Sequence, residues 1–459
     1  MKFQFVNLTT MNSLKIYNTL KREKEDFIPL SKDSVGMYVC GPTVYDEPHI
    51  GNARPLIIFD LVYRILIKNF GKDKVNYVRN ITDIDDKIIQ RASELKIDIN
   101  RLTKNITDIF FDDCKYLNCL VPNYQPKATE NISAMIKMTE NLITKQIAYV
   151  KNGNVYFNVN KFKDYGKLSN KNPKELISGS RVEISELKNN PLDFVLWKPS
   201  KDKEPSWDSP WGKGRPGWHI ECSAMAQKYL GKEFDLHCGG LDLIFPHHEN
   251  EIAQSICAND SNILAKYWMH NGYLTVNGKK MSKSEGNFVT INNLKNNFNG
   301  QIVRLSVLGT HYRQPLDWNL KILETNKKIL ENWYTFYSAE NEEINDELLN
   351  ILLDDLNTPK FITNIHSLYN KAKTGDTTAK KDLNSALKFI GLFNQSEEQF
   401  NSLRKKSNLD VGQIENLIDL RNLARKNKDF KKADKIRLDL ENNGILIEDL
   451  NDKTHWKYK

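Results

Sequence analysis

The chain has 459 residues, a hydrophobic content of 40% and a formal net charge of +8 at pH 7. This length is too great for one ordinary domain, and no apolar run of 18 residues is present, which excludes a membrane-spanning helix of the usual length. Residues 1–10 lack the pattern of a secretory signal, and the six cysteines are scattered rather than arranged as a disulfide framework. We therefore expect a large enzyme of a reducing compartment, the cytoplasm, with no membrane partner.

The first half of a candidate nucleotide site lies early in the chain. An apolar strand pattern over Val35–Val39 is followed by the tetrapeptide HIGN and then by Leu56–Val62, an apolar run of helix or strand type. This order predicts a strand-to-helix turn, where backbone N–H groups point at an anion. Gly51 permits close approach of a ligand to the backbone, and His49 and Asn52 offer hydrogen-bond donors to phosphate.

Residues 1–118 and 205–275 are predicted to form one nucleotide-binding α/β domain. Strand-like runs at Val35–Val39, Val75–Val78 and Phe234–His237 alternate with helical segments, a pattern typical of a parallel sheet with ligands at its switch point. Residues 119–204 interrupt this domain as an insertion. The apolar runs at Tyr149–Val150 and Asn154–Val159 favour short antiparallel strands there.

Residues in three distant segments make a candidate metal site. Cys40 precedes the HIGN turn, and Cys222 lies 25 positions before His247. If a helix begins near residue 249, His247 and Glu251 share one face, and His248 could share it too, because it lies three residues from Glu251. Two thiolates, an imidazole and a carboxylate suit Zn²⁺. Spacing alone leaves the choice of histidine open, and it favours buried thiols and a structural histidine pair over a metal site.

The second half of the nucleotide site is predicted in the region 276–330. The lysine segment, Lys280-Met281-Ser282-Lys283-Ser284, lies more than 200 residues after His49. Lys280 and Lys283, separated by small residues, could reach a triphosphate and neutralise the charge that develops as pyrophosphate leaves. A solvated basic loop is the alternative. The order of the two motifs favours a single ATP site that folding brings together.

The C-terminal part of the chain is predicted to be helical and to face RNA. Residues 331–395 have helical apolar spacing, and residues 396–459 contain a basic stretch from Arg421 to Arg437. Eight Lys and Arg residues in that stretch are accompanied by only two Asp, and apolar residues recur at near-helical intervals. We expect a helical segment with a basic face. A solvated charged surface is the alternative, and the stretch by itself favours it. The aminoacylation site implied by the resemblance described next favours RNA contact instead.

Several blocks resemble the cysteinyl-tRNA synthetases, a family of class I aminoacyl-tRNA synthetases. HIGN and KMSKS resemble the HIGH and KMSKS motifs of that class, with Asn52 in place of the second histidine. The more specific blocks are GWHIECS at 217–223 and FPHHENEIAQ at 245–254, and the resemblance runs in order from about residue 12 onward. It implies a Rossmann-type catalytic domain with an insertion, followed by helical C-terminal domains that end in an anticodon-binding region.

The resemblance also implies roles for particular residues. One Zn²⁺ per chain would be held by Cys40, Cys222, His247 and Glu251. The pocket for cysteine would be shaped by Thr82, Trp218 and His248. ATP, accompanied by Mg²⁺, would be bound by His49, Gly51, Asn52, Lys280 and Lys283. The catalytic residues among them would be His49, Asn52, Lys280 and Lys283.

The implied reaction is the ATP-dependent ligation of L-cysteine to tRNA(Cys) through a cysteinyl-adenylate, with zinc selecting the substrate thiol. The expected partners are tRNA(Cys), L-cysteine and ATP, and the expected state is a monomer. Two other classes stay open. A cysteine ligase that uses an amino sugar as acceptor would not need the basic C-terminal stretch. A non-catalytic RNA-binding protein on the same scaffold would be expected to lose His49, Lys283 or a zinc ligand.

Overall fold

The computed structural model describes residues 13–172, 186–281, 287–401, 409, 411–450 and 453–458. Lys280 and Met281 of the lysine segment are described, and Lys283 lies outside the described residues. Among the helices of the described parts, none combines the length and the apolar character that a membrane crossing requires.

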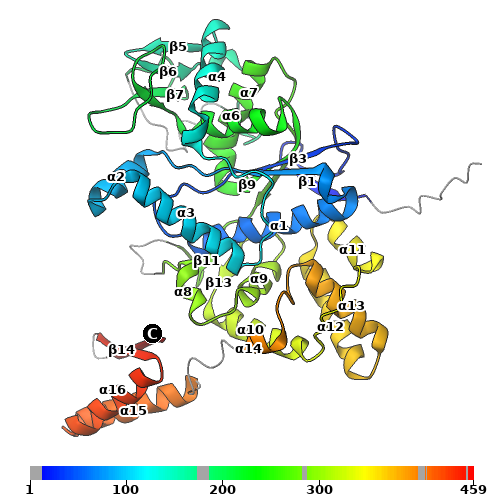
Figure 1. Cartoon of the computed structure of the whole chain (residues 1–459), viewed down its shortest axis with the longest axis vertical. Coiled ribbons are helices and arrows are strands. Elements are labelled where there is room, and N and C mark those ends of the chain that lie inside the picture. Colours follow the sequence, from blue (N-terminus) through cyan, green and yellow to red (C-terminus); the bar gives the residue numbers. More distant parts are fainter. Residues whose placement is uncertain are drawn as a thin grey trace, which may run out of the picture.

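A four-stranded parallel sheet carries the candidate site (Figure 1). Its order is β10 (Ala265–Asn271), β9 (Phe234–Gly240), β3 (Val35–Val39) and β4 (Val75–Arg79). Every residue of β3 is buried, as expected where helices cover both faces of a sheet. Met37 and Val39 pack into one core with α1 (Ile50–Phe70), whereas Tyr38 packs into a second core with α6 (Trp218–Leu230). This arrangement confirms the predicted α/β class.

Helix α1 begins at the HIGN tetrapeptide, as predicted. His49 has extended backbone and immediately precedes the first helical turn. The Asn52 Oδ1 atom accepts a hydrogen bond from the backbone N–H of His49 at 3.0 Å, so this side chain caps the helix. The stretch Leu56–Val62, which the sequence left open between helix and strand, lies within α1. A helix N-terminus is thereby placed beyond the carboxyl end of β3, a position at which proteins commonly bind anions.

An antiparallel sheet is formed by three strands of the insertion, as the sequence pattern predicted, together with one strand that follows it. Its order is β5 (Ala148–Lys151), β6 (Asn154–Phe157), β7 (Phe194–Pro199) and β8 (Gly214–Pro216). Helix α4 (Ile132–Thr144) joins its core to α6 and to α7 (Glu249–Asn259). The last strand, β8, ends directly before α6, so this sheet borders the candidate site.

A small third sheet presents the lysine segment. Its order is β12 (Lys279–Lys280), β11 (Leu274–Val276) and β13 (Leu316–Trp318). Asn277 and Gly278 join β11 to β12 with positive φ angles of 50° and 73°, as a two-residue type I′ turn requires. Because β11 follows β10 after two residues, the hairpin that holds Lys280 extends from the central sheet. The neighbouring helices are α8 (Ile291–Lys295) and α9 (Gly300–Leu308).

Helices dominate the rest of the main body. They are α10 (Leu320–Tyr334), α11 (Asp346–Leu353), α12 (Thr358–Lys373), α13 (Thr377–Phe389) and α14 (Glu397–Asn401). The elements near the start of the chain are β1 (Lys15–Asn18), β2 (Glu23–Asp26), α2 (Asp86–Leu95) and α3 (Ile99–Tyr116). Asn357 caps α12 by accepting a hydrogen bond from the Lys360 N–H. Phe400 of α14 stacks on Tyr334 at a ring-centroid distance of 4.2 Å, so the packed body extends beyond residue 396.

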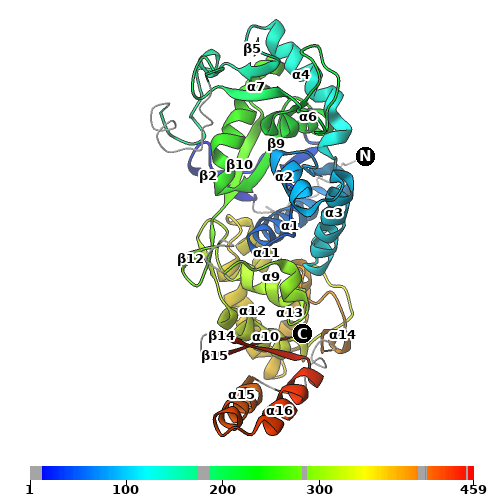
Figure 2. The same cartoon turned by 90° about the vertical axis from the view of Figure 1, so that its left-hand side faces the viewer.

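Four elements form a small C-terminal unit with its own core. They are α15 (Val411–Lys426), α16 (Phe430–Asn442), β14 (Ile445–Leu450) and β15 (Lys453–Tyr458). The basic stretch therefore forms parts of two helices, because Lys428 has a positive φ of 59° and Asp429 caps α16. In two perpendicular views, β5 and α4 lie at one end of the molecule and α15 and α16 at the other (Figure 1 and Figure 2).

Not every basic residue of this stretch faces solvent. Arg421 is buried and donates hydrogen bonds to both carboxylate oxygens of Asp449, at 3.0 and 2.8 Å. The Arg421 hydrogen bonds hold the pKa of Asp449 below its usual range. Arg425 also donates to Asp449, at 2.7 Å. The expectation that Arg421 belongs to a basic face is therefore wrong, because this residue is buried against Asp449 of β14. Arg425 is exposed, as expected, but its guanidinium is also paired with Asp449.

A buried carboxylate links α3 to the region after the lysine segment. Asp113 is fully buried, its Oδ1 lies 2.6 Å from Lys295 Nζ, and burial raises its pKa to about 6 although Lys295 opposes the shift. Between the unfolded pKa of about 4 and the folded value, the folded chain binds more protons than the unfolded chain. This contribution to stability is present at low pH and is lost as the pH rises through about 6.

Replacing Asp113 with asparagine should remove this pH dependence. We expect the difference in urea midpoint between the wild type and Asp113→Asn to change between about pH 4 and 6 and to be constant above pH 7. Asp112→Asn, at the exposed neighbouring position, is the control and should leave the profile unchanged. A difference that does not vary with pH would contradict the role assigned to Asp113.

Candidate active site

Four side chains from three distant segments meet at the carboxyl end of the central sheet. Cys40 directly follows β3, Cys222 lies in α6, and His247 and Glu251 lie just before α7 and in its first turn. Their donor atoms all lie within 4.8 Å of one another. Strands of a parallel sheet end at the same edge, which is why residues about 200 positions apart come together here.

The separations and chemistry of these donors suit a metal ion. The Sγ atoms of Cys40 and Cys222 are 3.8 Å apart, and neither cysteine forms a disulfide. Two thiolates bound to one Zn²⁺ at about 2.3 Å in a tetrahedral site would be about 3.8 Å apart. His247 Nε2 lies 2.9 Å from Glu251 Oε1. Two sulfurs, one imidazole nitrogen and one carboxylate oxygen therefore fit Zn²⁺.

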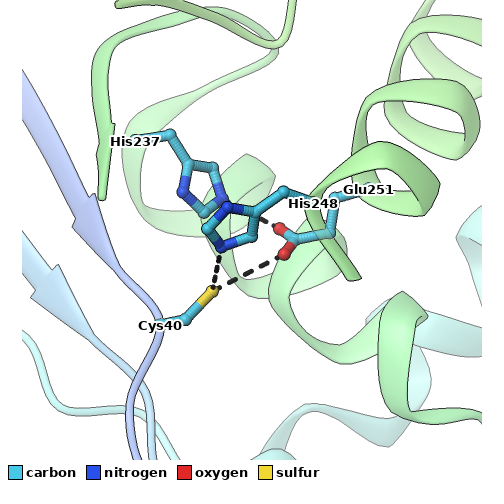
Figure 3. A group of neighbouring side chains, drawn as sticks. All are labelled: Cys40, His237, His248 and Glu251. Carbon is cyan, nitrogen blue, oxygen red and sulfur yellow. Dashed lines mark hydrogen bonds and ion pairs between the residues drawn. The ribbon is translucent and has the colours of Figure 1, made fainter. Parts of the chain in front are cut away.

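A second group of donors shares Cys40 and Glu251 with the first (Figure 3). His248 Nε2 lies 3.3 Å from Cys40 Sγ, and His237 Nε2 lies 3.0 Å from Glu251 Oε2. The structure therefore brings both candidate histidines, His247 and His248, to the cluster. His248 has a further partner, because its Nδ1 lies 2.8 Å from Nε2 of His270.

Two buried groups of the cluster, Cys222 and Glu251, favour their negatively charged forms, whereas burial raises the pKa of the Cys40 thiol. The hydrogen bond from Cys40 lowers the pKa of Cys222 below the ordinary thiol value, although burial opposes the shift. Burial also opposes ionisation of Glu251, but the neighbouring His237 and His247 outweigh it and hold the pKa of Glu251 well below its usual range. A thiolate and a carboxylate in a buried site attract a cation.

Sequence reasoning did not identify His237 and His270 as site residues. His237 is fully buried in β9, and His270 is almost fully buried near the end of β10. Their position near the carboxyl ends of predicted parallel strands could have indicated a role in the site, because ligand-binding residues gather there. A lone histidine in an apolar strand does not reveal its partners, so the hydrogen bond of His237 to Glu251 became visible only in the folded chain.

The three predicted pocket residues surround the cluster in different ways. Trp218 stacks on His247 with ring centroids 4.2 Å apart and stays 38% exposed. It lines a cavity of about 220 Å³ between the insertion and the central domain. Thr82 donates a hydrogen bond to Glu221 Oε2 at 3.0 Å, and Glu221 lines the same cavity. His248 is buried against Cys40.

The two nucleotide motifs also come together. The Ile50 N–H donates to the Val289 carbonyl and the Ile291 N–H to the Pro48 carbonyl, each at 2.9 Å. A Cβ atom on Gly51 would lie 3.5 Å from the Met281 side chain, so the lysine segment approaches the start of α1 at this glycine. His49 and Asn52 lie at the helix start, and Lys280 is exposed on β12. Folding therefore places the HIGN turn and the described part of the lysine segment, Lys280 and Met281, side by side.

Known proteins match this chain over nearly its whole length. The family model of the catalytic domain of class I (C) tRNA synthetases matches residues 26–328. A cysteine–tRNA ligase of Pelagibacter ubique is 54% identical over 445 residues, covering 96% of this chain and 98% of that protein. The cysteine–tRNA ligase of Rickettsia felis is 50% identical over 452 residues, covering 96% and 97%.

Solved structures show the same fold at low sequence identity. A LeuRS–tRNA–LeuAMS ternary complex of Agrobacterium radiobacter K84 aligns with a TM-score of 0.57 and 10% identity, over 82% of this chain and 86% of that chain. A methionyl-tRNA synthetase of Mycobacterium tuberculosis with methionyl-adenylate aligns with a TM-score of 0.51 and 16% identity, over 84% of each chain. The chain therefore belongs to the cysteine–tRNA ligase family of class I aminoacyl-tRNA synthetases.

Proposed function

We propose that this protein activates L-cysteine with ATP, forming cysteinyl-adenylate, and transfers the cysteinyl group to tRNA(Cys). The observation that carries the proposal is the meeting of Cys40, Cys222, His247 and Glu251 beside a helix N-terminus and a lysine hairpin. A simple nucleotidyltransferase would not need a metal site that selects thiols. A protein whose metal is purely structural would not need an ATP site beside it.

We assign the metal to Cys40, Cys222, His247 and Glu251 rather than to the group with His237 and His248. Their two thiolates make the softer donor set, which suits zinc. His237 contacts the second carboxylate oxygen of Glu251, as an outer partner does when it orients a ligating carboxylate. When bound, Zn²⁺ would offer a position to the substrate thiol, whose pKa of about 8.5 makes it a far better ligand than a serine hydroxyl.

In this proposal the chain acts on ATP by positioning and charge. The N-terminal end of α1, with the side chains of His49 and Asn52, would hold phosphate oxygens. Lys280, and Lys283 outside the described residues, would stabilise the charge on pyrophosphate as the cysteine carboxylate attacks the α-phosphorus of Mg²⁺-bound ATP. No side chain needs to act as a nucleophile. A ribose hydroxyl of the terminal adenosine, the 2′-OH by class resemblance, would then attack the activated carbonyl.

The amino-sugar acceptor is the nearer alternative, because it would use the same activation chemistry. The C-terminal unit argues against it, since α15 and α16 supply exposed lysines that such a ligase would not need. The relatives named cysteine–tRNA ligase also extend over nearly the whole of this chain. The domain boundaries predicted above, the monomeric state and the cytoplasmic location stay predictions.

The test of the proposed function is exchange of pyrophosphate into ATP with each amino acid in turn. Cysteine alone should support exchange, and serine should fail, because a hydroxyl does not replace the thiol at the metal site. Charging of tRNA(Cys) should then require the same cysteine. Exchange that accepts serine equally, or that occurs without an amino acid, would refute the proposal.

The exposed lysines of the C-terminal unit should matter for tRNA and not for adenylation. Replacing four of them with glutamine should spare pyrophosphate exchange and sharply reduce transfer to tRNA. The slope of log affinity against log salt should become less steep by about 0.7–0.9 for each phosphate that a lysine no longer neutralises. The substituted residues are Lys428, Lys431, Lys432 and Lys435, which are all exposed.

A control of equal charge change comes from α12 and α13. Its four exposed positions are Lys371, Lys373, Lys380 and Lys381. An equal loss of transfer to tRNA in both variants would show that transfer depends only on the net charge of the protein. Unchanged transfer in the variant of the C-terminal unit would show that its lysines do not contact RNA.

A further inference from the structure

Arg54 is a buried cation whose partners are all backbone carbonyls. It lies in the second turn of α1, two residues after Asn52, and is 1% exposed. Among the described residues no carboxylate forms an ion pair with it, and its Nε atom has no hydrogen-bond partner. Burial lowers its pKa to about 10, so the group stays charged at neutral pH. Burying an unpaired charge is costly, and an apolar residue at this position would avoid the cost.

Five carbonyl groups accept hydrogen bonds from this one guanidinium. Nη1 donates to Gly272 at 2.8 Å and Tyr273 at 2.6 Å. Nη2 contacts three more carbonyls, those of His311 at 3.3 Å, Tyr312 at 3.2 Å and Gln314. These acceptors belong to two loops, 272–273 and 311–314. Only a planar group with several fixed donors can meet so many carbonyls at once.

The two loops lead directly into the strands that support Lys280. Residues 272–273 precede β11, which pairs with β12, and residues 311–314 precede β13, which pairs with β11. The loops are also joined to each other, because the Gly272 N–H donates to the Tyr312 carbonyl at 2.8 Å. The guanidinium therefore ties the base of the lysine hairpin to the helix that begins at His49.

The chain that follows the lysine segment is tied to the same helix start at residues 288–291. The Ile50 N–H donates to Val289, and the Ile291 N–H donates to Pro48. The ring of His49 also lies 5.3 Å from the ring of Phe288, edge to face. Both flanks of the lysine segment are thus anchored on the first turns of α1. Without the Arg54 hydrogen bonds, the hairpin would lose its direct tie from the base to α1, although the later anchor, the strand pairing and the hydrogen bonds of Tyr312 and Arg313 to Asp355 would remain.

We propose that Arg54 is a positioning residue that sets the lysine hairpin at a fixed distance from the phosphate-binding start of α1. We call its five hydrogen bonds to carbonyl groups the Arg54 clamp. The catalytic consequence rests on the proposed function, because it assumes that Lys280 and His49 act on the same nucleotide. Arg54 is itself buried in the second turn of α1, and it acts through the two loops.

The test compares Arg54→Lys and Arg54→Gln with wild type by two measurements. Hydrogen exchange of the amides in 274–281 should be at least about tenfold faster in both variants, because the base of the hairpin is no longer anchored. The adenylation kcat should fall about tenfold or more, with the KM for cysteine nearly unchanged. Arg54→Lys keeps the charge and up to three donors, so its effects should be smaller than those of Arg54→Gln.

Arg304→Lys is the matched control. Arg304 is equally buried, contacts α1 through Asp60 and donates to the carbonyls of Ile390 and Leu117. This variant should lose thermal stability without faster exchange in 274–281 and without a selective fall in kcat. If Arg54→Gln fails to fold, the Lys variant still decides the result.

Unchanged exchange in 274–281, or the same acceleration in Arg304→Lys, would overturn the clamp. A wild-type kcat in Arg54→Lys would also overturn the clamp, because a positive charge at this position would then be enough for activity without the five hydrogen bonds. Failure of the proposed function looks different, since the wild type itself would show no cysteine-dependent exchange of pyrophosphate. The hydrogen-exchange result would still decide whether Arg54 holds the hairpin.

Discussion

Replacing Cys222 with serine should lower kcat/KM for cysteine at least about 100-fold, chiefly through KM, and should leave the KM for ATP nearly unchanged. The reason is the position of its sulfur, 3.8 Å from Cys40 Sγ and within a donor set that fits zinc. A serine hydroxyl is not ionised at neutral pH and is a poor zinc ligand. Metal analysis should find about one zinc per chain in the wild type and much less in the variant.

Cys257→Ser provides the matched control. Cys257 lies in α7, the helix that also carries Glu251, but belongs to neither donor group. The Cys257→Ser variant makes the same change from thiol to hydroxyl, and the protein should keep its zinc and its activity. If Cys222→Ser lost affinity for ATP and cysteine equally and unfolded at lower temperature, the metal would be structural. If it kept both zinc and cysteine affinity, the assigned ligand set would be wrong.

Replacing Lys280 with alanine should slow adenylation about 100-fold or more, with little change in the KM for cysteine. Its ammonium group is assigned to the charge that develops on pyrophosphate, and such charge is stabilised more in the transition state than in the ground state. Lys280 is exposed on β12, so its removal should cost little stability. Single-turnover measurement of cysteinyl-adenylate formation separates this rate from product release.

Lys279→Ala is the control for this experiment. Lys279 is the other residue of β12 and is also exposed, but successive side chains of a strand point to opposite faces. It should keep nearly the wild-type rate. An equal fall in both variants would indicate a general effect of positive charge on the hairpin. A wild-type rate in Lys280→Ala would remove this residue from the mechanism, and Lys283→Ala would then test the other lysine.

Local patterns in the sequence were enough to predict the fold class. The apolar run Val35–Val39 and the glycine turn after it indicated a strand followed by a helix, and both are present as β3 and α1. The pattern at Asn154–Val159 likewise predicted antiparallel pairing, which β5 and β6 show. These features depend on residues close to one another in the chain, and their periods of two and 3.6 residues can be read directly.

The side-chain partnerships could not be predicted in this way. Spacing left His247 and His248 as alternatives, and the folded chain brings both to Cys40 and Glu251. The basic stretch predicted Arg421 as surface, whereas Asp449, 28 residues later, holds it in the core of the C-terminal unit. The role of Arg54 could not be predicted at all, because its hydrogen-bond acceptors are backbone carbonyls, which every residue carries.

The sequence by itself therefore determined the α/β class, the start of α1 at HIGN and the residue types available for a metal and a triphosphate. Only the tertiary structure decided which of those residues meet. The order of strands β10, β9, β3 and β4 brings residues 40, 237 and 270 to one edge, although they are far apart in the chain. The physical reason is that local propensity acts over a few residues, whereas contacts across a parallel sheet depend on how distant segments pack.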